Sequence, residues 1–449
     1  MKVAKFGGSS LASAEQIKKV AQIVLSDEDR RVIVVSAPGK RNDSDTKVTD
    51  LLIECAKAFI KTGSADKEIE AVVDRYADII NGLDLSKDLI ETIRTDLYSR
   101  LEIGADHPDQ LTDALKAAGE DNNAKVVAAY LTALGKEAEY VNPKEAGMIL
   151  SDEPGNAQIL ESSYELLKCL KNRKAIVVFP GFFGYTEEGV LVTFPRGGSD
   201  ITGAILAAAV DADLYENFTD VDSVFAANPK IIENPKPILE LTYREMRELS
   251  SSGFSVLQEE TLVPVFKAKI PVCIRNTNNP AAPGTMIWPV RASISRSVSG
   301  IASENGFCTL QISKYLMNRE VGFIRKLLAI LEEFHISCEH IPSGIDDISV
   351  ILRKKNITEA TLNKIIKRIE SELHTDSIDV HQNIALIMLV GEGMKNSVGT
   401  AAKATRALAD ANINLEMINQ GSSEISMMFG VRAHEEKKAV TALYNALIH

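Results

Sequence analysis

A glycine-rich segment within the first ten residues could bind an anion. Residues 5–10 read KFGGSS, and a helical pattern begins near Ser13. Paired glycines let the backbone approach a ligand closely, the N–H groups at a helix N-terminus favour an anion, and Lys5 would add a positive charge. The segment could therefore hold a phosphate group. It is not a Walker A loop, because no G-x-x-x-x-G-K-[ST] pattern occurs in the chain, and a plain turn between a strand and a helix is the alternative.

A second segment repeats this arrangement. Residues 195–200 read PRGGSD, with two glycines, a hydroxyl group and Arg196 just before another predicted helix. Either segment alone could be an ordinary turn, because glycine-rich turns are common. Two of them in one α/β domain favour a single phosphate chain that is bound from two sides, with a pair of unrelated turns as the alternative.

An acidic segment follows another predicted strand. Residues 218–230 read FTDVDSVFAANPK, and Asp220 and Asp222 are too few for an EF-hand. At a strand end, Asp220 could contact the ribose or the adenine edge of a nucleotide, and Lys230 could contact a phosphate. Without further context, a solvated acidic loop explains these residues better.

One glycine pair imitates a dinucleotide-binding fingerprint. Gly391 and Gly393 follow the apolar segment IALIMLV and precede a predicted helix. Asn396 stands where the fingerprint has its third glycine, and the surrounding pattern is ferredoxin-like. We therefore expect no dinucleotide site there.

The composition argues against several classes of function. A net charge of −12 does not favour a broad basic surface for nucleic acid. The five cysteines are far apart and the seven histidines show no metal-ligand spacing, so we expect free thiols and no metal site made by the protein alone. We find no secretory leader and no apolar run of about 18 residues, and we expect no membrane contact and a cytoplasmic protein.

The predicted elements place these motifs where strands give way to helices. Residues 66–104 predict two amphipathic helices, which we interpret as an excursion from a sheet. The alternation of strands and helices elsewhere predicts an α/β/α sandwich with a mostly parallel sheet over residues 1–290. The expected strands are 3–6, 31–36 and 175–179, and the expected helices are 14–25, 48–60 and 200–210.

The C-terminal part has a different pattern. Proline and glycine are dense over residues 271–289, which indicates a domain boundary near residue 290. Residues 306–382 then predict a ferredoxin-like βαββαβ module. Residues 383–449 repeat the pattern but end one strand short, and residues 298–303 could supply that strand. We therefore expect interleaved modules, the second built from residues 297–304 plus 383–449.

Over essentially its whole length, the chain resembles the aspartokinase branch of the amino-acid kinase family. Residues 5–10 resemble the family's KFGGTS or KFGGSS signature, 196–200 its RGGSD motif, 219–221 its TDV motif and 119–120 its GE pair. The C-terminal repeat resembles a tandem of ACT modules. The resemblance implies transfer of the γ-phosphoryl group of ATP, with Mg²⁺, to the β-carboxylate of L-aspartate. The product would be 4-phospho-L-aspartate, in the first step of lysine, threonine and methionine biosynthesis.

The resemblance also assigns roles to individual residues. Lys5 and Asp200 would be catalytic, with Lys5 neutralising the transferring phosphoryl group. Arg196 would grip the α-carboxylate of aspartate, and Glu120 would pair with its α-ammonium group. The expected substrate-binding residues are Ser36, Thr49, Glu120 and Arg196, and the expected ATP-binding residues are Lys5, Gly7, Gly8, Ser9, Gly197, Gly198, Ser199, Thr219, Asp220, Phe225 and Lys230.

Three positions depart from the family pattern. Phe225 stands where many members have Tyr, and Lys230 where many have Arg. Ser255 stands where many members have Lys, which puts one nucleotide contact in doubt, and Lys267 or Lys269 could substitute for it.

The ACT pair implies feedback control by lysine, threonine or both. Glu339 could meet a cationic side chain such as that of lysine, whereas Phe323 and Ile324 could equally be core residues at a helix start. The resemblance also implies a homodimer through the ACT modules, with a tetramer as a further possibility. The expected effector pocket consists of Met317, Gly322, Phe323, Ile324, Cys338 and Glu339.

Two other functions compete with this hypothesis. A non-catalytic amino-acid sensor could keep the fold, but the presence of Lys5, Arg196 and Asp200 argues against it. A kinase for glutamate or acetylglutamate would lack a reason for the ACT tandem. Because no dinucleotide domain follows in this sequence, we expect a monofunctional aspartate kinase rather than a fusion to homoserine dehydrogenase.

Overall fold

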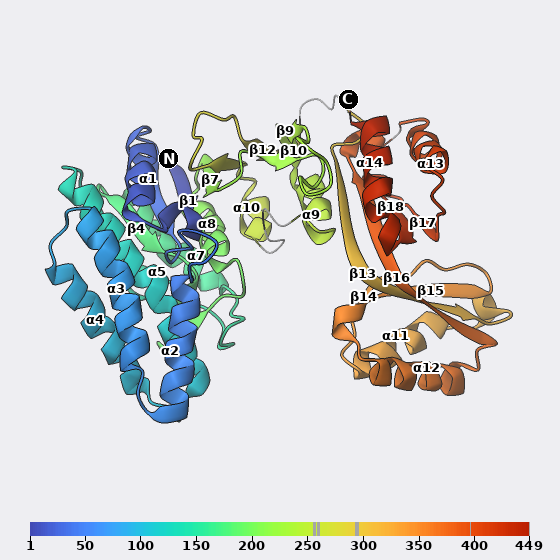
Figure 1. The fold of residues 1–449 in the computed structure, drawn as a ribbon, viewed down its shortest axis with the longest axis horizontal. Coiled ribbons are helices and arrows are strands. Elements are labelled where there is room, and N and C mark those ends of the chain that lie inside the picture. The colour runs from blue at the N-terminus through green and yellow to red at the C-terminus, as the bar shows by residue number, and fades with distance from the viewer. Residues whose placement is uncertain (255–256, 258–260, 292–295, 396, 449) are drawn as a thin grey trace. The chain divides into compact units, whose positions relative to one another are not determined.

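The computed structural model describes residues 1–254, 257, 261–291, 296–395 and 397–448 (Figure 1). The chain divides into two compact units. The first comprises Met1–Val224, Pro237–Arg247 and Ser255–Arg291, and the second comprises Phe225–Lys236, Glu248–Phe254 and Ala292–His449.

The first unit is built on an eight-stranded sheet with the order β10-β12-β11-β7-β1-β2-β4-β3. Neighbouring strands run parallel except β11 and β12, which are antiparallel. Consecutive residues of β2 are buried, as expected for a strand that is covered on both faces. The strands are β1 (Lys2–Phe6), β2 (Arg30–Val35), β3 (Ala138–Tyr140), β4 (Ile176–Pro180), β7 (Leu214–Thr219), β10 (Glu240–Thr242), β11 (Val272–Asn276) and β12 (Thr285–Trp288).

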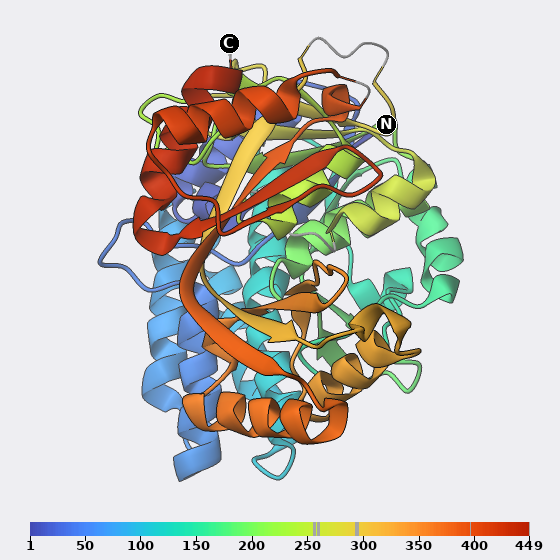
Figure 2. The ribbon, with the colours of Figure 1, turned by 90° about the vertical axis from the view of Figure 1, so that its right-hand side faces the viewer.

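Helices α2 to α5 stand side by side in this unit (Figures 1 and 2). The predicted pair over residues 66–104 is confirmed as α3 and α4, whose apolar faces share one core with α1, α2 and α5. The helices are α1 (Ala14–Leu25), α2 (Val48–Thr62), α3 (Asp66–Gly82), α4 (Asp88–Arg100), α5 (Pro108–Ala133), α6 (Pro143–Ala146), α7 (Glu161–Leu167), α8 (Gly198–Ala209), α9 (Tyr243–Ser251) and α10 (Leu262–Ala268). Short strand pairs complete the list: β5 (Phe183–Tyr185) with β6 (Leu191–Thr193), and β8 (Val224–Phe225) with β9 (Pro237–Ile238).

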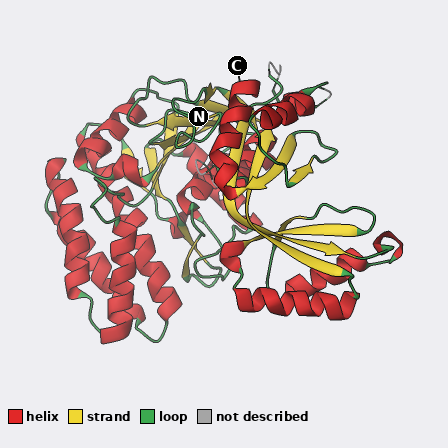
Figure 3. Ribbon diagram, turned by 45° about the vertical axis from the view of Figure 1, so that its right-hand side comes forward, coloured by secondary structure: helices red, strands yellow, loops and turns green. Residues whose placement is uncertain are grey.

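The second unit is built on a six-stranded antiparallel sheet with the order β14-β15-β13-β16-β18-β17 (Figure 3). Helices α11 and α12 pack on one half of it through an apolar core. The strands are β13 (Gly300–Ser313), β14 (Cys338–His340), β15 (Asp347–Arg353), β16 (Ser377–Val390), β17 (Met417–Asn419) and β18 (Ser426–Arg432). The helices are α11 (Phe323–Glu333), α12 (Glu359–Leu373), α13 (Thr400–Asp410) and α14 (Glu436–Leu447).

Two long strands, β13 and β16, run through both halves of this sheet. Among the described strands, the first half of β13 pairs with β16 alone, and its second half also pairs with β15. We expected residues 298–303 and the strand after residue 306 to be separate. They form one strand, and its register shifts at Gly306, whose φ of +90° glycine adopts without strain. The module limits 306–382 and 297–304 plus 383–449, like the kinase domain 1–290, stay predictions.

Among the described residues, no helix is both long enough and apolar enough to span a membrane.

Candidate active site

The candidate site lies where three adjacent parallel strands end. Lys5, near the end of β1, is in register with Val34 of β2 and Asn217 of β7. The carboxyl ends of parallel strands in an open α/β sheet are where ligands bind. Residues that follow these strands, such as Gly7 and Ser36, therefore meet at one edge of the sheet.

An ion pair joins the two glycine-rich segments. The Lys5 ammonium group lies 2.5 Å from Oδ1 of Asp200 in the first turn of α8. The same oxygen accepts a hydrogen bond from the Asn217 side-chain amide at 2.7 Å. The predicted convergence of segments 5–10 and 195–200 is thereby confirmed. Asn217 was not among the predicted site residues, although its place two residues before Thr219 on a buried strand was a usable signal.

Backbone hydrogen bonds join the first glycine turn to neighbouring segments. The Gly7 N–H donates to the Phe218 carbonyl at 3.1 Å, and the Gly39 N–H donates to the Gly8 carbonyl at 2.8 Å. A Cβ atom on Gly39 would lie 2.5 Å from the Gly8 carbonyl carbon, so only glycine permits this approach. The two loops after β1 and β2 are therefore fastened face to face.

The helix after the first glycine turn begins where it was predicted, but the two glycines do not lie at its N-terminus. Gly8–Leu11 form a 3-10 turn, and α1 begins only at Ala14, where the Ser13 hydroxyl caps it by accepting from the Gln16 N–H. The second segment behaves as predicted, because α8 begins directly at Gly198. An anion at this site would therefore use the N-terminus of α8 and the turn at Gly8, not the N-terminus of α1.

Glu120 is a buried carboxyl group beside this pair. It lies in the middle of α5, and 5% of its surface is exposed. Burial raises the pKa of the Glu120 carboxyl to about 8, and it outweighs the Ala37 backbone, the Lys5 charge and the Ser199 hydroxyl, which lower the pKa. Among the described residues, no group donates a hydrogen bond to Glu120 Oε2. A cationic ligand group would satisfy this oxygen.

Asn123, one turn further along α5, is a second buried side chain that was not among the predicted site residues. Its amide nitrogen donates to the Ser36 carbonyl at 2.7 Å, and its Oδ1 has no partner in the described part of the chain. Glu120 and Asn123 are three residues apart on one helix and therefore face the same side. Ser36 is half-buried beside them, and Thr49 is half-buried in the first turn of α2.

The second glycine turn presents side chains of contrasting exposure. Ser199 is buried, whereas Arg196 is exposed, as is Ser9 on the first turn. The fork of Arg196 is therefore accessible to a planar anion such as a carboxylate.

Some of the predicted ATP-binding residues lie at this edge of the sheet, and others lie in the second unit. Thr219 and Asp220 end β7, where the Thr219 hydroxyl donates to Asp220 Oδ1 at 3.2 Å. The Ser10 and Thr277 hydroxyl oxygens, 2.7 Å apart, link the first glycine turn to the end of β11. Phe225 and Lys230 belong to the second unit, and their contribution to this site stays a prediction. Ser255 lies outside the described residues.

The side chains at this site suit a metal ion that is bound together with the phosphates of a nucleotide. The described residues contain no group of three or more His, Cys, Asp or Glu side chains that could hold a metal ion. Mg²⁺ is usually bound by one or two carboxylates together with substrate phosphates. Asp200 supplies one carboxylate at the strand ends, so the residues fit a magnesium–nucleotide complex.

The expected effector residues lie in the second unit. Met317 and Phe323 are buried in the core that α11 shares with the sheet, whereas Ile324 is 44% exposed. Glu339 on β14 accepts hydrogen bonds from Arg353 at 2.8 and 3.3 Å. Gly322 caps the start of α11, and Cys338 begins β14. The alternative that Phe323 and Ile324 are core residues at a helix start is thus confirmed for Phe323 but not for Ile324.

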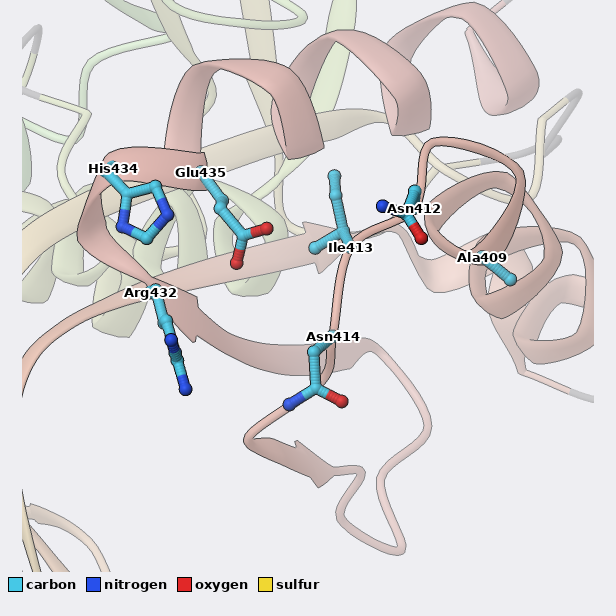
Figure 4. A pocket seen from close by; sticks show the side chains of 7 residues that line it. All are labelled: Ala409, Asn412, Ile413, Asn414, Arg432, His434 and Glu435. Carbon is cyan, nitrogen blue, oxygen red and sulfur yellow. The ribbon is translucent and has the colours of Figure 1, made fainter.

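A separate pocket of about 530 Å³ lies at the other half of this sheet (Figure 4). It does not include the expected effector residues. Within the described chain, Arg432 donates to Glu416 at 3.2 Å, so its charge is already paired. The lining residues are Ala409, Asn412, Ile413, Asn414, Arg432, His434 and Glu435.

The sequence and the fold are similar to those of known proteins. Residues 1–276 match the model of the amino acid kinase family, and residues 387–447 match that of the ACT domain. Aspartokinase 3 of Bacillus subtilis (strain 168) is 58% identical over 444 residues, which cover 99% of this chain and 98% of the relative. The Clostridium acetobutylicum aspartate kinase structure is 40% identical, with a TM-score of 0.89 and 100% of both chains covered. E. coli aspartokinase III in complex with aspartate and ADP has a TM-score of 0.79 over 100% of both chains at 24% identity, a likeness of fold.

Proposed function

The chain belongs to the amino acid kinase family, within its aspartokinases, and from this premise we propose that it transfers the γ-phosphoryl group of ATP to the β-carboxylate of L-aspartate. The product is 4-phospho-L-aspartate, and the reaction opens the biosynthesis of lysine, threonine and methionine. The observation that carries the proposal is the Lys5–Asp200 pair, which joins both glycine turns beside the buried carboxyl of Glu120.

The reaction needs positioning and charge neutralisation more than proton transfer. A carboxylate with an ordinary pKa near ~4 is ionised at neutral pH, so the acceptor needs no general base. One of its oxygens attacks the γ-phosphorus, the bond from this phosphorus to the bridging oxygen breaks, and ADP leaves with the electron pair. Both partners are anions, and Lys5 with the Gly8 amide reduces their repulsion, whereas the Gly7 N–H already donates to the Phe218 carbonyl.

The substrate side is formed by residues of opposite charge. Arg196 binds the α-carboxylate of aspartate through its planar fork, and Glu120 pairs with the α-ammonium group. Ser36 and Thr49 provide hydroxyl groups on the same side. An ammonium group at Glu120 would end the isolation of its buried Oε2, which explains why an unpaired carboxyl group is retained there.

The nucleotide side combines the glycine turns with the end of β7. The proposed ATP-binding residues are Lys5, Gly7, Gly8, Ser9, Gly197, Gly198, Ser199, Thr219, Asp220, Phe225 and Lys230. Mg²⁺ bound to the phosphates would neutralise charge on them, and Asp200 would orient Lys5 or bind the metal's water shell.

Regulation is proposed to act through the ACT modules. Lysine, threonine or both would bind around Met317, Gly322, Phe323, Ile324, Cys338 and Glu339 and favour one state of a homodimer, or of a tetramer built from it. Glu339 would have to exchange its bonds to Arg353 for those to a ligand. A cytoplasmic location stays a prediction.

An acyl-phosphate assay tests the proposal. The full chain is incubated with ATP, Mg²⁺ and an amino acid, and hydroxylamine converts any acyl phosphate to a coloured hydroxamate. We expect product with L-aspartate, and much less with glutamate or acetylglutamate. Product from glutamate or acetylglutamate alone would assign the enzyme to another amino-acid kinase. Binding of aspartate without turnover would favour the amino-acid sensor.

A further inference from the structure

Two consecutive polar residues are buried on helix α3. Arg75 is 4% exposed, and Tyr76 is 0% exposed. They lie in the helical excursion formed by α3 and α4, which contributes no residue to the proposed catalytic or binding groups. Burying a guanidinium group and a phenol is costly unless each is well bonded, so their partners indicate what the burial achieves.

Arg75 binds the loops that follow β1 and β2. One guanidinium nitrogen donates to the Ala12 carbonyl at 3.0 Å and to the Gly39 carbonyl at 2.7 Å. Another donates to Asp45 at 2.6 Å. A planar guanidinium group can bridge acceptors on separate segments, whereas a lysine ammonium group has a different donor geometry.

These contacts lead to the first glycine turn in one further step. Gly39 touches Gly8 directly, since its N–H donates to the Gly8 carbonyl at 2.8 Å. Ala12 follows the same turn after Leu11. Arg75 therefore fixes both sides of the Gly8–Gly39 contact, and through Asp45 it also fixes the loop that leads into α2 and Thr49.

Tyr76 makes the corresponding contact on the substrate side. Its hydroxyl group donates to the Gly119 carbonyl at 2.6 Å. Gly119 immediately precedes Glu120 on α5. The phenol is entirely buried, and burial raises its pKa well above the ordinary value, so it stays a donor. Tyr76 therefore fixes the helical turn that carries the buried carboxyl group.

We propose that Arg75 and Tyr76 are positioning residues, through which α3 holds the phosphate-binding turn with one side chain and the acidic substrate-binding turn with the next. This inference rests on the proposed function for the identity of the two ligands. It predicts that neighbouring residues of one helix control different substrates.

The kinetic test uses two conservative variants. Arg75→Lys keeps the charge beside Asp45 but loses the fork, and we expect kcat/KM for ATP to fall by about 10- to 100-fold. The change in KM for aspartate should be smaller, because Arg41 still binds Asp45 in the loop that leads to Thr49. Tyr76→Phe loses one hydrogen bond, and we expect KM for aspartate to rise by about fivefold or more with little change in KM for ATP.

Matched controls come from the neighbouring helix α4. Arg94→Lys alters an ion pair with Glu70, and Tyr98→Phe removes a hydroxyl group that donates to Asp66 at 3.1 Å. Both groups lie in the same excursion but touch neither turn, so we expect both variants to keep the wild-type KM values.

Amide hydrogen exchange supplies a readout that does not depend on activity. We expect faster exchange over residues 7–12 and 37–47 in Arg75→Lys, and over residues 117–123 in Tyr76→Phe.

An equal loss for both substrates in both variants, or faster exchange spread over the whole first unit, would overturn the proposal. If the wild-type chain does not turn over ATP and aspartate, the proposed function fails, whereas the exchange pattern still tests the positioning roles. If Arg75→Lys does not fold, Tyr76→Phe still decides the substrate-side half.

Discussion

Two glutamates, Glu120 in the first unit and Glu339 in the second, were both expected to meet a cationic group of an amino acid. The structure gives them opposite surroundings. Glu120 is buried, its pKa is raised to about 8 by that burial, and one of its oxygens has no partner among the described residues. Glu339 is half-exposed, and both of its oxygens accept hydrogen bonds from Arg353.

Within the part of the chain that the structure describes, Glu120 has an unpaired oxygen that a ligand cation could bind, whereas the charge of Glu339 is already paired with Arg353. A buried carboxyl group without a partner costs stability, and a ligand ammonium group can recover that cost. A carboxylate that already has an arginine partner gains little from a new cation, because one pair replaces another. The first unit therefore shows a binding site more directly than the second.

The most severe way to break the first site is to remove its cation. Lys5→Met should lower kcat by about 1,000-fold, because the phosphoryl group loses its main charge stabilisation in a preorganised site. Lys2→Met, on the same strand and paired with Asp27, is the matched control and should keep activity. Steady-state kinetics measures kcat of both variants, and circular dichroism checks that both are folded. Near-normal turnover by Lys5→Met would remove Lys5 from the mechanism.

A smaller effect is expected at the exposed edge of the same site. Arg196→Ala should raise KM for aspartate by about 10- to 100-fold and leave KM for ATP nearly unchanged, because the lost hydrogen bonds are to a charged carboxylate. Arg196→Lys should recover only part of the affinity, since it lacks the fork. Equal losses for both substrates would contradict the role assigned to Arg196.

The smallest effect is expected in the second unit. Glu339→Gln should shift the lysine concentration for half-inhibition by less than about fivefold, because the charge it removes is already paired and half-exposed. Arg353 would keep Glu304 as a partner. An inhibition curve with lysine measures the shift. Complete loss of inhibition would show that effector binding depends strongly on the Glu339 charge despite its pairing with Arg353, and the contrast with Glu120 would then fail.

Much of the fold and of the site was predictable because it depends on local signals. The apolar β-branched run 31–36 predicted β2, and the amphipathic spacing over 66–104 predicted α3 and α4. The glycine pairs with Lys5 and Arg196 marked both turns. These features need only neighbouring residues to be recognised.

Other features were beyond sequence reasoning because they arise when distant segments meet. Asn217 and Asn123 look like ordinary polar residues until the sheet brings β7 and α5 to the loops after β1 and β2. Arg75 lies on an amphipathic helix, and only the fold shows that its face turns toward Gly39. The continuity of β13 through Gly306 likewise depends on pairing with β16, which lies far along the chain.

The most direct test is the proton balance of aspartate binding at pH 7. With a pKa of about 8, Glu120 in the free protein is mostly protonated at this pH, and a bound ammonium group favours its ionised form. Binding should therefore release about one proton per site, and affinity should rise with pH up to about 8. Calorimetry in two buffers of different ionisation enthalpy measures the release. We predict release from the wild-type protein and none from Glu120→Gln; no release from the wild type, or equal release from both, would contradict the account.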